Sequence, residues 1–149
     1  MIRKFVFLLL LITLPVGCTK KVFQDPPIHV YHDFDEYMNA IKTETKAVNG
    51  YSRWITPTRS MVPLIHDYDW VVMLPASLAP YKDLKVGDVV AYDATWTGHD
   101  DTQVLHRIQG SDNWGWIIGG DGNATNDPEH VTEKNYLGKC VEIYRFERQ

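Results

Sequence analysis

The sequence predicts a small, mainly β domain with one helix near its N-terminus. After residue 50, short runs of β-branched and aromatic residues alternate with Gly, Asp, Asn and Pro, which is typical of short strands joined by turns. Before residue 50, one segment carries apolar residues at helical spacing. The 149 residues, 44% of them hydrophobic, suffice for one domain with a core and are too few for two. We therefore expect one open or barrel-like β fold with long loops.

Residues 1–17 have the layout of an export signal. Two basic residues precede an apolar run that is shorter than the roughly 20 residues of a membrane-spanning helix, so we expect the segment to be removed after export. The run ends on Gly17 and Cys18, which resembles the lipobox of bacterial lipoproteins, although Pro15 stands where that family usually has Leu. The resemblance implies that Cys18 is lipidated and tethers the protein to a membrane outside the cytoplasm, on the periplasmic side in a Gram-negative cell. The alternative is an ordinary signal peptide that ends beside Cys18.

Residues 18–32 contain two adjacent prolines and no helical period, so we expect a linker that follows the lipid-attachment cysteine. The folded domain is expected to span residues 33–149. It begins with a helix, since Asp33 and Glu36 form a capping-box-like start and Asn49-Gly50 supplies a stop. The apolar stripe that would pack this helix onto the core consists of Phe34, Tyr37, Met38, Ile41 and Val48.

Five predicted strands follow, at residues 69–74, 87–94, 103–110, 114–122 and 138–146. Cys140, in the last of them, is expected to be a small buried hydrophobe rather than a reactive thiol, because its neighbourhood does not favour a thiolate. Three tryptophans fit either the core or a surface patch that meets a membrane or a substrate; they are Trp96, Trp114 and Trp116.

The composition excludes some classes of function. The formal net charge is −4, with acidic and basic residues interspersed, whereas nucleic-acid binding requires a concentrated basic face. No metal or other cofactor is expected, because the candidate ligands lack the close His or Cys spacing of metal sites; they are His99, Asp100, Asp101 and His130. We expect a monomer.

One serine, in "TPTRSMVP", is a candidate nucleophile. Pro57 and Pro63 fix their own φ angles and bias the residues before them toward extended geometry, so the chain around Ser60 is stiff. A serine hydroxyl attacks a carbonyl only when it is held in place and a base removes its proton. The segment is neither a G-x-S-x-G elbow nor an S-x-x-K motif. Ser60 alone therefore defines no enzyme class.

Three further segments follow "SMVP", in the order "LKVGDVVAYDA", "VLHRIQG" and "GGDGNATND". Together the four resemble the signal peptidase I and LexA-like serine peptidase superfamily, in which an S-M-x-P segment is followed by a Gly-Asp strand, a strand bearing the general base and a Gly-Asp loop. The resemblance covers roughly residues 56–141. It implies a LexA/signal-peptidase-like complex β fold, and a serine endopeptidase that cuts exported polypeptide substrates after a small side chain.

The resemblance also assigns roles to residues. Ser60 matches the nucleophile, and His106 occupies the place of the base, which is a lysine in bacterial signal peptidases and a histidine in the branch represented by the archaeal and endoplasmic-reticulum signal peptidases. In that branch an aspartate completes the set. Asp127 is the expected partner of the imidazole, with Asp121 as the alternative or as a residue that fixes the loop. A histidine, with a pKa of about 6.5, serves as a base without the deep burial that a lysine requires, but it needs a carboxylate to fix its tautomer.

Two more residues match the family beside the nucleophile. Thr58 corresponds to a hydroxyl that assists the backbone N–H of the serine in binding the oxyanion, so we expect Thr58 and the Ser60 amide to do this. Met61 corresponds to the methionine that lines the pocket for the residue before the cut.

Three positions depart from the family pattern. Arg59 stands where Gly or a small residue usually precedes the serine, Leu64 stands where Thr often follows the proline, and Tyr68-Asp69 stands where Gly-Asp usually opens the first core strand. These departures leave the path of the loop and the substrate preference open. The alternative to a peptidase is a catalytically silent lipoprotein with the same fold that binds a peptide or an envelope partner.

Overall fold

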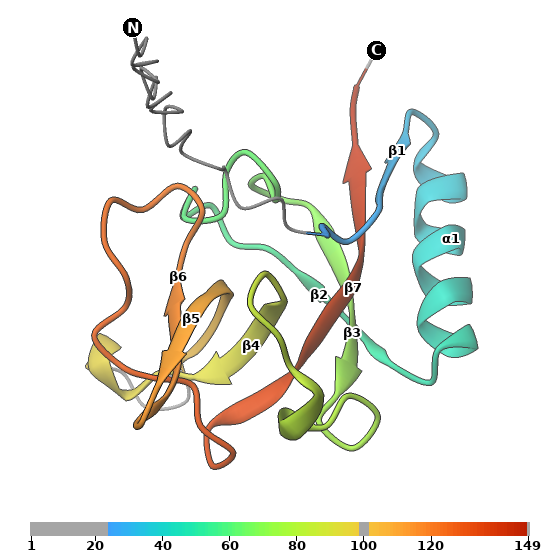
Figure 1. The fold of residues 1–149 in the computed structure, drawn as a ribbon. Coiled ribbons are helices and arrows are strands. Elements are labelled where there is room, and N and C mark those ends of the chain that lie inside the picture. The colour runs from blue at the N-terminus through green and yellow to red at the C-terminus, as the bar shows by residue number, and fades with distance from the viewer. Residues whose placement is uncertain (1–23, 99–101, 149) are drawn as a thin grey trace, which may run out of the picture.

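Seven strands form one sheet in the computed structural model, which describes residues 24–98 and 102–148 (Figure 1). The export signal, Cys18 and three of the candidate metal ligands, His99, Asp100 and Asp101, lie outside the described residues. The elements are β1 (Ile28–Tyr31), α1 (Phe34–Ala47), β2 (Tyr51–Trp54), β3 (Trp70–Pro75), the 3-10 helix η1 (Tyr81–Asp83), β4 (Val89–Asp93), the 3-10 helix η2 (Thr95–Thr97), β5 (Gln103–Asp112), β6 (Gly115–Gly119) and β7 (Tyr136–Phe146).

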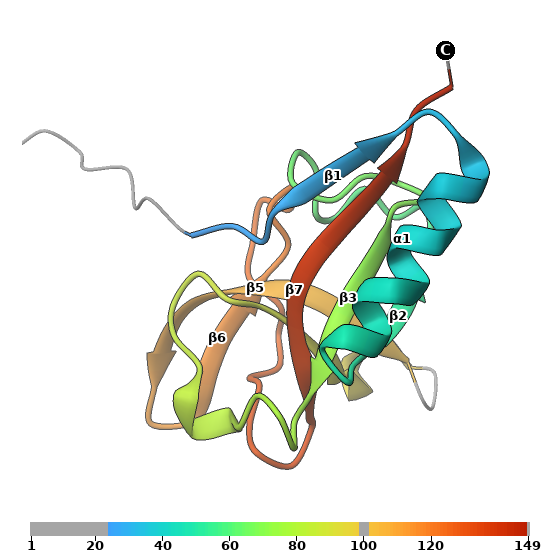
Figure 2. The same ribbon diagram turned by 90° about the vertical axis from the view of Figure 1, so that its right-hand side faces the viewer.

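The strands lie in the order β2-β3-β7-β4-β5-β6, and each neighbouring pair is antiparallel. β1 adds a parallel pair along β7, so the long β7 runs through the middle of the sheet (Figures 1 and 2). The described residues contain a single α-helix. The predicted fold class, a small mainly β domain with one N-terminal helix, is confirmed.

The helix α1 begins and ends where the sequence predicts. The Asp33 carboxylate accepts a hydrogen bond from the Glu36 amide at 2.8 Å, which caps the first turn. Asn49 has a φ of 52°, a left-handed conformation that stops the helix. Tyr37 and Ile41 are buried with residues of β3 and β7, so the helix covers one face of that part of the sheet (Figure 2).

The other face of β3, β4 and β7 carries the core cluster that anchors the loop between β2 and β3. Val71, Ala91 and Ile143 from these strands pack with Met61 and Ile65 from the loop. The loop segment that starts one residue after Ser60 is therefore fixed by burial of apolar side chains.

Cys140 is buried in the same cluster. Burial raises the pKa of its thiol to about 12, so the thiolate does not form near neutral pH. The prediction of a small buried hydrophobe is confirmed.

Two strands were not predicted. Residues 18–32 were expected to be a linker, but Ile28–Tyr31 forms β1, which pairs with residues 143–146 of β7. Four residues are too few to show a period, and β1 exists because β7 offers it a partner edge. The folded domain therefore begins before residue 33. β2 was missed for the same reason, since its four residues depend on their pairing with β3.

The three tryptophans differ in burial and surroundings. Trp116 is partly buried against the ring of Tyr81, at 6.4 Å between centroids. Trp114 is 76% exposed in the turn between β5 and β6. Trp96, 45% exposed, lies in η2 and lines the pocket described below.

Candidate active site

Ser60 lies in the loop between β2 and β3, on a tight turn. Arg59 has a φ of 59°, and its amide donates to the Asp67 carboxylate at 3.2 Å. The Val62 amide donates to the Arg59 carbonyl at 3.3 Å, which closes the turn around Ser60. The stiffness that the flanking prolines indicated thus coincides with a turn that is bonded on both sides of Ser60.

The same loop is tied to β7 by a buried ion pair. The Asp69 carboxylate accepts from Arg145 Nε at 3.1 Å and Nη2 at 2.8 Å, and from the His66 amide at 2.9 Å. Arg145 Nη2 also donates to the Leu64 carbonyl at 3.0 Å. Because Asp69 is almost fully buried, these bonds hold the far end of the loop in one place.

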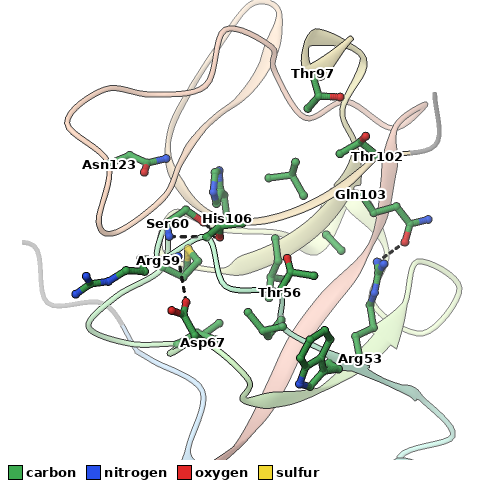
Figure 3. A pocket seen from close by; sticks show the side chains of 18 of the residues that line it. Arg53, Thr56, Arg59, Ser60, Asp67, Thr97, Thr102, Gln103, His106 and Asn123 are labelled. Carbon is green, nitrogen blue, oxygen red and sulfur yellow. Dashed lines mark hydrogen bonds between the residues drawn. The ribbon is translucent and has the colours of Figure 1, made fainter. Parts of the chain in front are cut away.

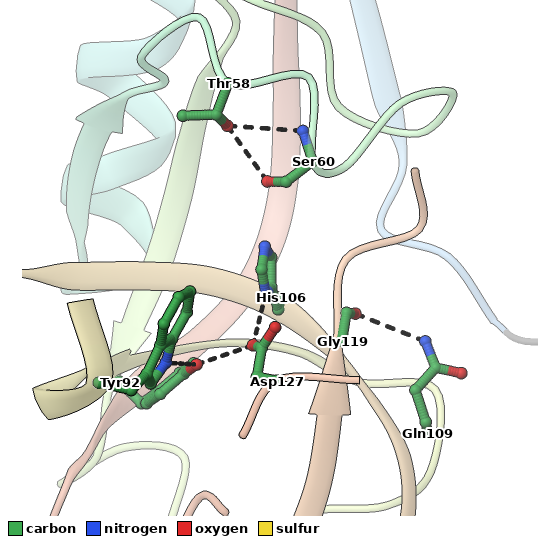
Figure 4. A network of polar contacts seen from close by, with 8 residues as sticks. Thr58, Ser60, Tyr92, His106, Gln109, Gly119 and Asp127 are labelled. Atoms are coloured by element: carbon green, nitrogen blue, oxygen red, sulfur yellow. Dashed lines mark hydrogen bonds and ion pairs between the residues drawn. The ribbon is translucent and has the colours of Figure 1, made fainter. Parts of the chain in front are cut away.

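His106 lies on β5 and is buried with its carboxylate partner. Its Nδ1 is 2.6 Å from Asp127 Oδ2, and both side chains are about 5% exposed or less (Figure 4). Asp127 follows β6, and its amide donates to the Ile118 carbonyl at 2.8 Å, which fixes its backbone. An ionised carboxylate only accepts hydrogen bonds, so in the neutral imidazole the ring proton is on Nδ1 and the lone pair is on Nε2. This is the tautomer that a general base needs.

The free ring nitrogen of His106 points toward the Ser60 hydroxyl (Figure 4). In the part of the chain that the structure describes, no hydrogen bond joins the two side chains. Ser60 Oγ instead lies 3.2 Å from Thr58 Oγ1, and the Ser60 amide donates to the same oxygen at 3.5 Å. Direct proton transfer from Ser60 Oγ to His106 would require the hydroxyl to come within hydrogen-bonding distance of the imidazole, which it can do while it still accepts from Thr58.

Two glycines allow the loop between β6 and β7 to lie against the Ser60 segment. A Cβ on Gly120 would be 2.3 Å from the Ser60 carbonyl oxygen and 3.0 Å from His106 Nε2. A Cβ on Gly122 would be 2.7 Å from the Arg59 carbonyl oxygen, and the Gly122 amide donates to the Ser60 carbonyl at 2.8 Å. A side chain at either position would push the serine away from the imidazole.

Asp121 does not contact His106. It binds the next residue of β5, because Arg107 Nε and Nη2 donate to its two carboxylate oxygens at 2.7 Å each. Arg107 Nη1 donates to the Gly87 carbonyl at 2.9 Å and lies 2.8 Å from an Asp25 oxygen. Of the two aspartates considered from the sequence, Asp127 is therefore the one that holds the imidazole, and Asp121 fixes the loop.

Ser60 and His106 open onto a pocket of about 410 Å³ (Figure 3). Met61 is one of the residues that line it. Its apolar lining is Ile55, Met61, Ile65, Ala91, Val104 and Leu105. Its polar rim includes Thr58, Arg59, Asp67 and Asn123. The pocket is thus large and apolar enough to take side chains of a polypeptide.

Residues 24–98 and 102–148 contain no group of three or more His, Cys, Asp or Glu side chains that could hold a metal ion. His130, a candidate ligand from the sequence, is 3.0 Å from Asp112. Within the same residues, no helix combines the length and the apolar character that crossing a bilayer requires.

Sequence reasoning missed Tyr92 as a residue of the site, and it named Trp96 only as a core residue or as part of a surface patch. Tyr92 donates a hydrogen bond to Asp127 Oδ2 at 2.7 Å, and Trp96 Nε1 donates to the Tyr92 hydroxyl at 3.2 Å. In the sequence, Tyr92 is one aromatic residue among several in a predicted strand. In the structure Val90 pairs with His106, so Tyr92, two residues after Val90, lies on the same face of the sheet as His106. This register cannot be read from the sequence.

The chain matches no protein-family model. A search of curated proteins finds no similar sequence either. The class of the protein therefore rests on its own fold and site, which are a mainly β domain and a pocket where a serine faces a buried histidine–aspartate pair.

Proposed function

We propose that this protein is a serine endopeptidase of the signal-peptidase-like type, tethered to a membrane through Cys18, that cleaves exported polypeptides. The observation that carries the proposal is the 2.6 Å contact between His106 Nδ1 and Asp127, which leaves the other ring nitrogen facing Ser60 at the pocket. These three residues come from two loops and one strand, between 21 and 67 residues apart along the chain. Packing alone gives no reason for them to converge on a pocket.

The geometry supports acylation by proton transfer. Ser60 Oγ attacks the carbonyl carbon of the peptide bond and its proton moves to His106 Nε2, while Asp127 stabilises the imidazolium. His106 then gives the proton to the leaving amine as the C–N bond breaks, which leaves an acyl-serine. A water molecule, deprotonated by the same imidazole, hydrolyses the ester and restores the serine hydroxyl.

The expected oxyanion donors lie together. The Ser60 amide and the Thr58 hydroxyl are 3.5 Å apart, so one oxygen atom can accept from both. In this structure Thr58 Oγ1 itself accepts from the amide, and a substrate oxygen would replace it. Thr58 would then donate its own proton to the same oxygen.

Two strand edges favour an extended polypeptide as substrate. β5 pairs with β4 over residues 103–107 and with β6 from Arg107 onward, so one edge of residues 103–106 has no strand partner among the described residues. β2 likewise pairs with β3 alone in the described chain. Arg53 of β2 and Gln103 of β5 are hydrogen-bonded across the pocket, which both strands line. An extended peptide can therefore bond to backbone edges on both sides while its side chains enter the apolar pocket.

The backbone supports the alignment with the peptidase family at two of the positions where the sequence departs from it. Arg59 replaces a usual Gly or small residue and has a φ of 59°. Tyr68 replaces a usual Gly and has a φ of 72°. Glycine is favoured where φ is positive, so the turns retain a conformation that suits glycine although their side chains differ.

The test is covalent labelling and cleavage by the full chain in detergent. A fluorophosphonate probe should label Ser60, and a library of unfolded exported polypeptides should be cut, with new N-termini identified by mass spectrometry. Ser60→Ala should abolish both, while Ser111→Ala, a control on the exposed end of β5, should retain both. Peptide binding without cleavage by either protein would favour the catalytically silent binding module instead.

The membrane tether has its own test, since Cys18 lies outside the described residues. Fatty-acid labelling in a bacterial host should modify the wild-type chain and spare Cys18→Ser. Equal labelling of both chains would reject lipidation at Cys18 and leave the peptidase proposal standing.

A further inference from the structure

Four side chains form a continuous hydrogen-bonded row behind the serine. Asp127 Oδ2 accepts two hydrogen bonds, one from His106 Nδ1 at 2.6 Å and one from the Tyr92 hydroxyl at 2.7 Å. The Tyr92 oxygen in turn accepts from Trp96 Nε1 at 3.2 Å (Figure 4). Tyr92 is fully buried, whereas Trp96 lines the pocket. The row therefore connects the pocket wall to the carboxylate that holds the imidazole.

The hydrogen bonds from Trp96 through Tyr92 to Asp127 can run in one direction, from donor to acceptor. An indole N–H only donates, so the Tyr92 oxygen must accept at that contact. Its single proton is then available for Asp127, which as a carboxylate only accepts. The bond from Trp96 thus orients the Tyr92 hydroxyl, which donates its proton to the Asp127 oxygen that also binds His106. Burial strengthens such bonds because no water competes for the groups.

Tyr92 and Trp96 are each held in place by the element that carries them. Tyr92 and Val90 lie on the face of β4 that pairs with Val104 and His106 of β5. Trp96 lies in η2, where the Glu129 carboxylate accepts from the Thr95 amide at 2.9 Å. Strand pairing thus places the phenol, and the hydrogen bond from Thr95 to Glu129 holds η2, which carries the indole, against the loop that carries Asp127.

Packing does not explain the contact between Tyr92 and a carboxylate. Two other tyrosines of the same core cluster, Tyr81 and Tyr136, donate to the backbone carbonyls of Val131 at 3.2 Å and Ala79 at 2.8 Å. The hydroxyls of these two tyrosines thus serve as hydrogen-bond donors to main-chain carbonyls. The hydroxyl of Tyr92 instead binds the one carboxylate that contacts His106.

We propose that Tyr92 is a positioning residue of this site, which fixes the Asp127 carboxylate toward His106, and that Trp96 orients the Tyr92 hydroxyl for this purpose. The inference rests on the proposed peptidase function for its effect on the rate. Burial, and secondarily the charge of Asp127, raise the pKa of Tyr92 although its bond from Trp96 lowers it, so the phenol remains a donor at every working pH. Without that donor, the carboxylate is free to rotate away from Nδ1.

The test compares Tyr92→Phe with Tyr136→Phe in the full chain. The first readout is the proton NMR signal of His106 Nδ1–H, assigned through ¹⁵N-labelled histidine and the His106→Gln variant; this signal needs no catalysis. Tyr92→Phe should shift or broaden it, and should lower kcat about 10- to 100-fold with KM unchanged, the range for a lost hydrogen bond to a charged group. Tyr136→Phe, which also removes one buried hydroxyl, should leave the signal and kcat as in the wild type.

Trp96→Phe provides a second measurement, because it removes the donor from a partly exposed position. It should move the same signal in the same direction by a smaller amount. If Tyr92→Phe does not fold, as judged by circular dichroism, Trp96→Phe decides: an unchanged signal overturns the proposal.

Failure of this inference differs from failure of the proposed function. Normal turnover and an unchanged His106 signal in Tyr92→Phe would overturn the positioning role alone. If the wild-type chain cuts no substrate but Tyr92→Phe changes the His106 signal, the peptidase proposal is overturned. The positioning role of Tyr92 in the hydrogen-bonded row then still stands.

Discussion

Two adjacent residues of β5, His106 and Arg107, each bind an aspartate from the loop between β6 and β7. His106 is held by Asp127, and Arg107 is held by Asp121. Successive residues of a strand point to opposite faces, so the loop supplies one carboxylate to each face of β5. Both pairs are largely buried, and each consists of a basic side chain and a carboxylate.

The two pairs differ in whether the basic side chain presents a nitrogen atom to the pocket. Arg107 directs its guanidinium to Asp121, to the Gly87 carbonyl and to Asp25, which joins three segments of the chain. His106 binds Asp127 through one nitrogen and presents the other to the pocket. Of these two buried pairs, the one that contains His106 therefore leaves a nitrogen atom that a molecule in the pocket could reach.

The largest expected effect separates the two aspartates by activity. Asp127→Asn should lower kcat about 10,000-fold, because the amide no longer selects the Nδ1–H tautomer or stabilises the imidazolium. Single-turnover cleavage by the folded variant, with circular dichroism as a check of folding, measures this. Asp121→Asn serves as the comparison, and an equal loss of kcat in both folded variants would contradict the division of roles.

The second effect distinguishes Asp121 from Asp127 by its contribution to the stability of the fold. Asp121→Asn should lower the free energy of unfolding by about 3 kcal/mol, because it leaves the buried Arg107 charge without its bidentate partner. Urea denaturation measures the change, and Asp83→Asn, at an exposed aspartate of η1, is the matched control. A loss no larger than that of the control would mean that Asp25 and Gly87 suffice to hold Arg107.

The third effect tests the spacing between the loop and the nucleophile. Gly120→Ala should reduce kcat about 100-fold, because its Cβ would collide with the Ser60 carbonyl oxygen and approach His106 Nε2. Gly110→Ala on β5 is the control, since its Cβ would meet only Ile117 Cδ1, at an ordinary 3.8 Å. Activity of Gly120→Ala close to that of the control would show that the nucleophile sits elsewhere during catalysis.

The smallest effect is a difference in pH response. As the pH falls and the His106 imidazole becomes protonated, kcat/KM should drop, because a protonated imidazole cannot accept the proton of the serine hydroxyl. Burial alone would lower the pKa of Arg107, but Asp121 and Asp25 raise it above its ordinary value, so its stabilising contribution persists until strongly alkaline pH. Activity and circular dichroism measured from pH 5 to 8 should therefore diverge. A flat acid limb of activity would count against histidine as the base.

The sequence sufficed for the elements whose signals are local. The helix has its own cap at Asp33 and its own stop at Asn49, and the five predicted strands contain enough residues to show their type. Ser60, His106 and Asp127 could be selected because the order of short motifs resembles a known superfamily. The structure then places Ser60 and His106 at one pocket, with Asp127 bonded to His106 behind it.

The rest depends on pairing between distant segments. β1 and β2 are four residues each and form because β7 and β3 offer partner edges. The choice between Asp121 and Asp127 depends on which face of β5 each one reaches, and Tyr92 depends on the register of β4 against β5. None of these relations appears in a local pattern of residue types.

The place of β7 in the sheet has a consequence for biosynthesis. β7 follows every other described element along the chain, yet it separates β2 and β3 from β4, β5 and β6. Until the ribosome has made β7, the half that carries Ser60 and the half that carries His106 share no strand pairing. A nascent chain therefore lacks the complete sheet that holds Ser60 beside His106 until translation has passed residue 146.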